Sequence, residues 1–221
     1  VERLKDIRDG HPDYLIFQQA KDTDNKEGIS YELNGTHYKT YIAQNDKSGA
    51  DNLGRGMTVP MQHWDEAGMF PNIQLSYPVA LNTAIAAVET AKDNNKPHTN
   101  IITTTAGKLD TKEGRFTHSL ITNALNFTEK IYDCKNKDEL NEIVDNGSSN
   151  KMIYIVYSYL QLGYTHEWFR EKSQRSAGSQ DDIDRDFLNI WKLGSATGVL
   201  SQHLLKSAKQ NEKDEKLIKN I

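Results

Sequence analysis

Two short β-prone runs, separated by one long helical pattern, constrain the possible folds of this chain more than any other feature. The runs lie at residues 57–64 and 100–105, and the helical pattern covers residues 76–93. Neighbouring parallel strands need a helical crossover between them, and ligands bind beyond the carboxyl ends of such strands. We therefore expect an α/β fold with an open, mostly parallel sheet and a ligand site where these two strands end.

Acidic residues come directly after the first run. Asp65 could hold Mg²⁺ through water, because Mg²⁺ binds few carboxylates and keeps several waters. Glu66 could orient or deprotonate an attacking water. The small residues Ala67 and Gly68 that follow would leave room for a phosphate and water. Most Asp-Glu pairs are solvated loop residues, so the residue types alone leave both interpretations open.

Three consecutive hydroxyl side chains complete the second run: Thr103, Thr104 and Thr105. They could hydrogen-bond the acidic pair or a γ-phosphate and relay the nucleotide state to the next helix. Threonine also favours strands, so a simple strand end is the alternative interpretation. Arg55, which lies between two glycines ahead of the first run, belongs either to a tight turn or to a loop that touches phosphate or DNA.

No segment reads G-x-x-x-x-G-K-[ST], the loop that cradles nucleotide phosphates in many nucleotide hydrolases. The only Gly-Lys pair, Gly107-Lys108, is followed by Leu109. The chain also starts at Val1 rather than at a methionine, and we expect it to be a piece of a longer protein. We accordingly predict negligible ATPase activity from these 221 residues alone.

Composition narrows the function classes. The net charge of −4 argues against a stand-alone nucleic-acid binder, although a local basic patch remains compatible with it. Cys134 is the only cysteine, so an internal disulfide is impossible. The histidines lack zinc-site spacing, and no apolar run is long enough to span a bilayer. We expect a cytoplasmic protein without a membrane partner.

Local patterns predict further elements. Asn34-Gly35 between two β-prone runs predicts a hairpin near the N-terminus with a type I′ turn, followed by a polar loop over residues 44–56. Pro78 should fall in the first turn of the 76–93 helix. The apolar side of that helix is expected to comprise Leu75, Val79, Ala80, Ala84, Ala87 and Val88.

Towards the C-terminus, residues 152–159 carry the strongest strand signal in the chain. Helices are expected at residues 112–126, 137–145, 165–173 and 181–191, with a lysine-rich helix or linker at 207–221. The last of the four helices should bury Ile183, Phe187, Ile190 and Trp191.

Taken together, these segments resemble the large terminase subunit of tailed bacteriophages, the ATPase that drives DNA packaging. The resemblance runs through most of the chain and rests on the order and spacing of four segments. They are Leu53 to Thr58, Trp64 to Asn72, Ile101 to Gly107 and Arg185 to Trp191.

The resemblance implies a role for each candidate residue. Asp65 would be the Walker B aspartate at the Mg²⁺ site, and Glu66 the catalytic glutamate that activates water. Arg55 would lie near nucleotide, DNA or a neighbouring subunit. The three threonines would match the motif that couples ATP hydrolysis to movement.

The resemblance also implies organisation and partners. A P-loop-type ATPase core without its phosphate-binding loop would occupy residues 1–150. The remainder of the core and a small helical subdomain would occupy 151–206, and a linker 207–221. Double-stranded DNA, the portal protein and the small terminase subunit would be partners of a homo-oligomeric ring in the bacterial cytoplasm. The phosphate-binding loop would precede Val1, and a nuclease domain would follow Ile221.

Two other functions share these features. A helicase-like ATPase also places an acidic pair and a threonine segment at neighbouring strand ends, but it needs a second full α/β domain. An interaction module could keep the fold without the chemistry. A phosphate-binding segment encoded upstream in the same reading frame would favour the motor.

Overall fold

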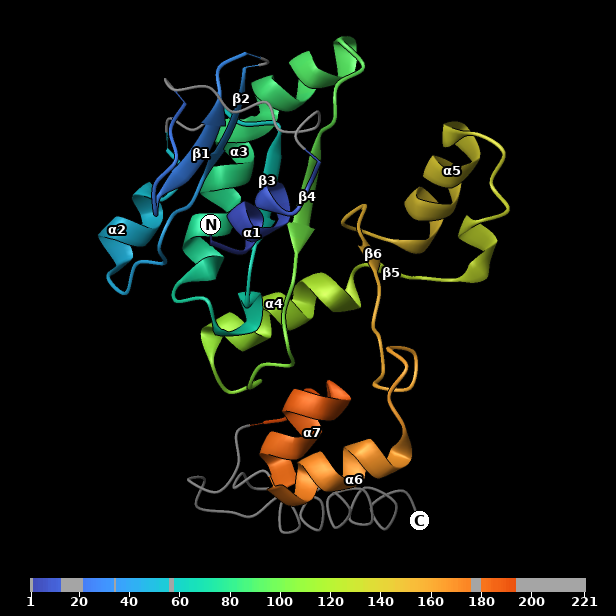
Figure 1. Ribbon diagram of the computed structural model, residues 1–221. Helices are drawn as coiled ribbons and strands as arrows, with labels where there is room; N and C mark the ends of the chain where they lie inside the picture. The colour runs from blue at the N-terminus through green and yellow to red at the C-terminus, as the bar shows by residue number, and fades with distance from the viewer. Residues whose placement is uncertain (1, 13–21, 34, 56–57, 176–179, 194–221) are drawn as a thin grey trace, which may run out of the picture. The chain divides into compact units, whose positions relative to one another are not determined.

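The computed structural model describes residues 2–12, 22–33, 35–55, 58–175 and 180–193. The chain divides into two compact units, Val1–Asn45 and Asp46–Ile221. Both belong to a mixed α/β architecture in which the described strands form short antiparallel and parallel pairs (Figure 1). Among the described helices, none has the length and apolar character needed to cross a membrane. The predicted linker at 207–221 lies outside the described residues.

The first unit contains the predicted hairpin. Helix α1 (Glu2–Asp9) precedes β1 (Gly28–Tyr31) and β2 (Thr36–Lys39), which pair antiparallel. Pairing stops at Tyr31 and Thr36, so the connection is longer than the two residues of the predicted type I′ turn. Asn34 itself lies outside the described residues, while Gly35 has a φ of 68°.

A β-α-β unit forms the centre of the second unit, as the sequence predicts. Strand β3 (Met61–Trp64) leads through helix α3 (Ile73–Asp93) to β4 (Thr99–Ile102), and the two strands pair in parallel. The first strand starts later than predicted and directly after Pro60, which has no N–H for a ladder bond. The helix begins earlier than predicted, so Pro78 lies inside it rather than in its first turn.

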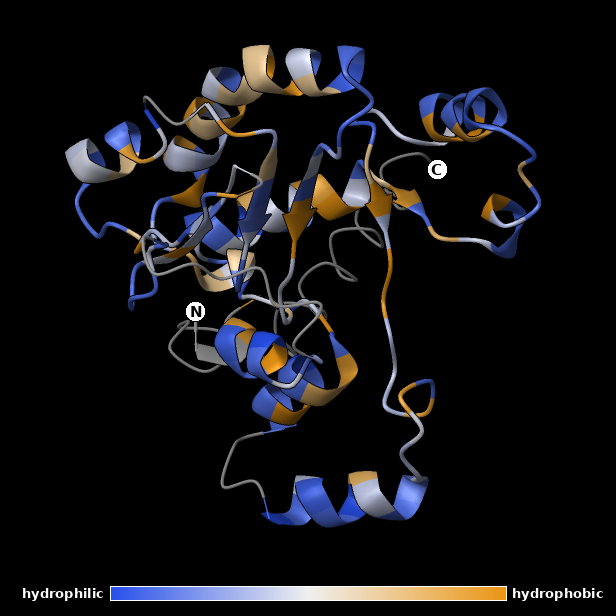
Figure 2. Ribbon diagram, turned by 45° about the horizontal axis from the view of Figure 1, so that its top comes forward, coloured by the Kyte–Doolittle hydropathy of each residue, from blue (hydrophilic) through white to orange (hydrophobic). Residues whose placement is uncertain are grey.

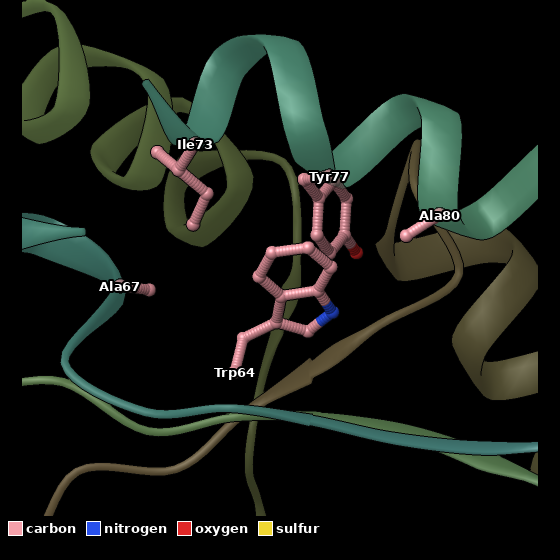
Figure 3. Close-up of a cluster of buried hydrophobic side chains, with 5 residues drawn as sticks. All are labelled: Trp64, Ala67, Ile73, Tyr77 and Ala80. Atoms are coloured by element: carbon pink, nitrogen blue, oxygen red, sulfur yellow. The ribbon is translucent and has the colours of Figure 1, made fainter. Parts of the chain in front are cut away.

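An aromatic core holds α3 against the strand pair. Figure 3 shows Trp64 projecting from the end of β3 toward Tyr77 on α3. The Trp64 ring lies edge-on to the rings of Phe70 and Tyr77, with centroid distances of 5.3 and 5.4 Å. Burial raises the pKa of Tyr77, and a hydrogen bond from the Asn100 amide opposes that rise. Of the six predicted core positions on α3, Ala80 and Ala84 are fully buried and the other four are partly buried.

A second β-α-β unit follows helix α4 (Lys112–Thr122). Strand β5 (Leu125–Asn126) leads through α5 (Lys137–Gly147) to β6 (Ile153–Tyr154), again in parallel. The predicted helix 112–126 is therefore too long at its end, because residues 125–126 form a strand. The predicted strand 152–159 pairs over two residues only.

Side chains beyond that short pairing stay exposed. Ile155 and Val156 are 46% and 48% exposed, and Figure 2 shows the hydrophobic colour continuing along the extended chain after β6. The predicted polar loop at 44–56 contains a short helix, α2 (Lys47–Asn52), whose N-cap Asp46 accepts a hydrogen bond from the Gly49 amide at 2.7 Å.

Helices α6 (His166–Arg175) and α7 (Gln180–Leu188) are the last two described helices. Phe187 contacts the rings of Trp168 and Phe169 edge-on, at 6.3 and 6.0 Å. Helix α7 ends three residues before Trp191, so Ile190 and Trp191 lie outside the helix that was predicted to contain them. None of the residues of α7 is fully buried, so the predicted buried stripe is wrong. Ile190 is 41% exposed.

Candidate functional site

The alternation of side chains along the β3–β4 pair separates a core face from an exposed face. Gln62, Trp64 and Ile102 lie on the face toward α3 and are buried or half-buried. His63 and Ile101, paired in register, point to the opposite, exposed face. Because the two strands run parallel and end in register at Trp64 and Ile102, the residues directly beyond them come to lie at one edge.

Asp65 and Thr103 meet at that edge. The Thr103 hydroxyl donates to Asp65 Oδ1 at 2.7 Å, and the same hydroxyl oxygen lies 2.8 Å from His63 Nε2. All three residues are exposed. Asp65 and Thr103, which are 38 residues apart in sequence, are thus joined by a direct hydrogen bond.

Glu66 and Thr105 form a second pairing beside the first. The Thr105 hydroxyl donates to Glu66 Oε2 at 3.2 Å, and the Thr105 amide donates to the same oxygen at 3.4 Å. The Glu66 backbone is left-handed, with a φ of 51°. A non-glycine residue in this conformation carries strain, and such strain is concentrated at functional sites. The turn after β3 therefore places Glu66 in a backbone conformation that costs free energy.

Backbone bonds tie the acidic turn to the threonine segment. The Thr103 amide donates to the Trp64 carbonyl at 2.9 Å, and the Ala67 amide donates to the Thr103 carbonyl at 3.1 Å. Thr104 contributes differently from its neighbours, because its hydroxyl oxygen accepts the Gly68 amide at 2.9 Å. Thr103 and Thr105 thus bind the acids, whereas Thr104 braces the turn that carries them.

Helix α4 supports the same turn from the other side. Thr117 is 1% exposed, and its hydroxyl donates to the carbonyl of Ala67 at 3.0 Å. Glu113 accepts a hydrogen bond from the amide of Asn72, the residue that opens α3. The acidic turn is therefore anchored both to the threonine segment and to α4.

The space above Gly68 is filled, contrary to the expectation that Ala67 and Gly68 leave room for phosphate. A Cβ atom built on Gly68 would lie 2.9 Å from Thr104 Oγ1 and 3.2 Å from the Trp191 ring. A Cβ on Gly107 would lie 2.8 Å from the Gly68 carbonyl oxygen. The two glycines allow the acidic turn, the loop after the threonines and Trp191 to approach closely. The surface available to a ligand is instead the exposed edge with Asp65 and Glu66.

The segment after α7 is bonded to the loop after the threonines. The Leu109 amide donates to the Lys192 carbonyl at 2.8 Å, next to an isolated parallel bridge between Lys108 and Lys192. The Lys192 ammonium contacts the carboxylates of Asp181 and Asp184. Its hydrogen bond holds the pKa of Asp184 below the usual value for aspartate. Through Lys192, these contacts connect the loop that follows the threonine segment to helix α7.

Arg55 is not brought to the acidic edge by any hydrogen bond or ion pair among the described residues. Its guanidinium contacts the Asp51 carboxylate at 3.1 Å and the Asp51 carbonyl at 2.8 Å. Next to it, the Gly54 carbonyl accepts from Thr83 at 2.9 Å, which ties this loop to α3. The structure therefore gives Arg55 a local partner, and its predicted contact with nucleotide or DNA stays a prediction.

The acidic edge fits a hydrated cation better than a bare one. Within the described ranges, no group of three or more His, Cys, Asp or Glu side chains could enclose a metal. Mg²⁺ needs no such enclosure, because one or two carboxylates and several waters are its usual protein site. Asp65 is exposed and already fixed by Thr103, so it suits water-mediated binding.

Sequence reasoning missed three contributors to this site. His63 lies on the same strand face as Asp65, so the alternation of side chains could have identified it. Thr117 and Trp191 reach the acidic turn from segments about 50 and 120 residues further along the chain. Nothing in their local sequence signals that contact.

Comparisons of the chain with protein-family models, with curated proteins and with solved structures found no match.

Proposed function

We propose that this chain carries the hydrolytic edge of an ATP-driven DNA-packaging motor of the large terminase kind. One observation carries the proposal: Asp65 and Glu66, at the end of β3, are hydrogen-bonded to Thr103 and Thr105, at the end of the adjacent parallel strand. In open α/β sheets this edge is where ligands bind. A nucleotide hydrolase can use one carboxylate at such an edge for Mg²⁺ and a second one for the attacking water.

The residues divide the work as follows. Asp65 is the residue that would hold a hydrated Mg²⁺, through waters bound to the ion. Mg²⁺, when bound with the triphosphate, neutralises charge on the transferring phosphoryl group. Glu66 orients the attacking water and accepts its proton, and its left-handed backbone limits the directions in which it can point.

Thr103 and Thr105 hold the two carboxylates apart and oriented. A movement of the Glu66 carboxylate would displace Thr105, to which it is hydrogen-bonded. The displacement would then pass along the chain through Gly107 to Leu109. The bond from Leu109 to Lys192 would carry that change to α7. This contiguous route is a physical basis for coupling hydrolysis to movement of the segment that follows.

The proposal extends to the wider assembly. The β3–β4 pair would belong to a larger, mostly parallel P-loop-type sheet completed by a phosphate-binding segment outside these residues. The intact protein would act in the cytoplasm of an infected bacterium as a homo-oligomeric ring. Its partners would be double-stranded DNA, the portal protein and the small terminase subunit.

The experiment begins with the reading frame upstream of Val1. We expect it to encode a G-x-x-x-x-G-K-[ST]-type segment, and we expect the complete product to hydrolyse ATP in the presence of Mg²⁺ and DNA. Asp65→Asn should raise the Mg²⁺ concentration needed for half-maximal rate, whereas Asp93→Asn, an exposed acid at the end of α3, should not. ATP turnover without an upstream phosphate-binding segment, or turnover indifferent to Asp65→Asn, would contradict the proposal. Strand separation of duplex DNA by the complete product would favour the helicase-like alternative.

A further inference from the structure

The Thr103 hydroxyl contacts both Asp65 and His63, and these two contacts together determine which nitrogen of His63 carries a proton. A threonine hydroxyl has one proton to donate and two lone pairs that can accept. Thr103 Oγ1 lies within hydrogen-bond distance of both Asp65 Oδ1, at 2.7 Å, and His63 Nε2, at 2.8 Å. The single hydroxyl proton can serve only one of these two contacts.

The charge of the Asp65 carboxylate determines which of the two contacts the Thr103 proton occupies. An ionised carboxylate only accepts hydrogen bonds, and a bond to it is stronger than one between neutral groups. If the hydroxyl pointed at His63, a lone pair of Thr103 would face a lone pair of Asp65 across 2.7 Å. The favourable arrangement therefore places the Thr103 proton on Asp65. The remaining contact then requires His63 Nε2 to carry a proton and to donate.

We propose that His63 is a positioning residue, which donates from Nε2–H to the Thr103 oxygen and thereby holds in place the hydroxyl whose proton is bonded to Asp65. The direction runs from imidazole to hydroxyl to carboxylate. The consequence for Mg²⁺ rests on the proposed function: with Oδ1 fixed by Thr103, the carboxylate keeps acceptor capacity for water bound to the cation. Without the imidazole donor, the Thr103 hydroxyl is held only by its bond to Asp65, and Asp65 loses part of its orientation.

The position of His63 in the strand explains why this residue can act in this way. It precedes Asp65 by two residues and lies on the same exposed face, and its register partner is Ile101, two residues before Thr103. The ring therefore lies on the strand pair while its Nε2 reaches the edge. Glutamine can place an amide nitrogen near the Nε2 position, whereas asparagine is one carbon shorter and leucine has no donor.

The first test reads the imidazole directly in the 221-residue chain. Long-range ¹H–¹⁵N correlation spectra, recorded in alkaline buffer, distinguish the two tautomers of a neutral imidazole. We expect the Nε2–H tautomer for His63, and we expect Thr103→Val to shift its Nε2 resonance. His98, whose Nδ1 lies 3.0 Å from the Lys96 carbonyl oxygen, is the internal control. An Nδ1–H tautomer at His63, or a His63 resonance indifferent to Thr103→Val, overturns the proposal whether or not the protein hydrolyses ATP.

The second test measures the Mg²⁺ requirement of ATP hydrolysis by the complete protein. His63→Leu and His63→Asn should raise the half-saturating Mg²⁺ concentration about twofold to tenfold, the range expected for one neutral hydrogen bond. His63→Gln should restore it, and His98→Gln should leave it unchanged. In the Thr103→Val background, His63→Leu should have no further effect. Additive effects, or equal effects of Gln and Leu, overturn the positioning role; absence of any Asp65-dependent turnover overturns the proposed function instead.

Discussion

The buried hydroxyl of Thr117 gives a sharp test of how the acidic turn is anchored. Replacement of Thr117 by valine keeps the shape of the side chain and removes its one donor. The Ala67 carbonyl, on a residue that is 0% exposed, then loses its bond from α4. A buried acceptor left without a partner costs about 1–3 kcal/mol. This carbonyl also accepts the Phe70 amide at 3.3 Å, so we expect the low end of that range, about 1.5 kcal/mol.

The assay is thermal unfolding followed by circular dichroism. For a chain of this size, about 1.5 kcal/mol corresponds to a fall in Tm of roughly 3–6 °C. Thr122→Val is the matched control, because Thr122 lies on the same helix and is exposed. That control should change the stability by less than about 0.5 kcal/mol. The amide protons of residues 67–69 should also exchange faster in Thr117→Val. Equal Tm values for the two variants would refute the anchoring role of Thr117.

Three further predictions follow from the same site. Gly107→Ala should destabilise by about 1–3 kcal/mol in denaturant titrations, because its Cβ would meet the Gly68 carbonyl and the Trp191 ring; a wild-type midpoint would contradict that packing. Glu66→Gly should be more stable than Glu66→Ala by about 1 kcal/mol, because only glycine tolerates the φ of 51° without strain; the reverse order would show that the turn relaxes. The third concerns Asp184, whose pKa is lowered by Lys192 in the folded chain. Its contribution to stability is complete above the ordinary aspartate pKa of about 3.9 and is lost as the pH falls through the lower folded pKa. Asp184→Asn should therefore lower the Tm at neutral pH more than at a pH of about 2, and a pH-independent loss would be contrary to this ion pair.

The sequence could predict the β-α-β unit and the meeting of acids with threonines, because both follow from local patterns. Strand alternation and the parallel crossover place the residues after β3 and β4 at one edge. The helical period also identified Ala80 and Ala84 as core positions. These are consequences of backbone geometry, so they need no knowledge of distant contacts.

The failures came where distant segments decide the outcome. The run at 152–159 has high β-propensity, but that propensity reflects packing against neighbours, and only Ile153 and Tyr154 find a partner strand. The room assigned to phosphate above Gly68 is taken by Thr104 and Trp191, which no local pattern could reveal. The contact between His63 and Thr103 is different, because strand alternation already places both residues on one face and only the reach of the side chain was missing.

The most direct measurement of the central claim is a single-turnover ATPase assay on the complete protein with Glu66→Gln. The amide keeps the size of Glu66 but cannot take a proton from water. We predict that ATP binding survives while the hydrolysis rate falls by about 10²–10⁴-fold, and that Glu89→Gln on the exposed side of α3 changes neither. A Glu66→Gln protein that hydrolyses bound ATP at the wild-type rate would contradict the account.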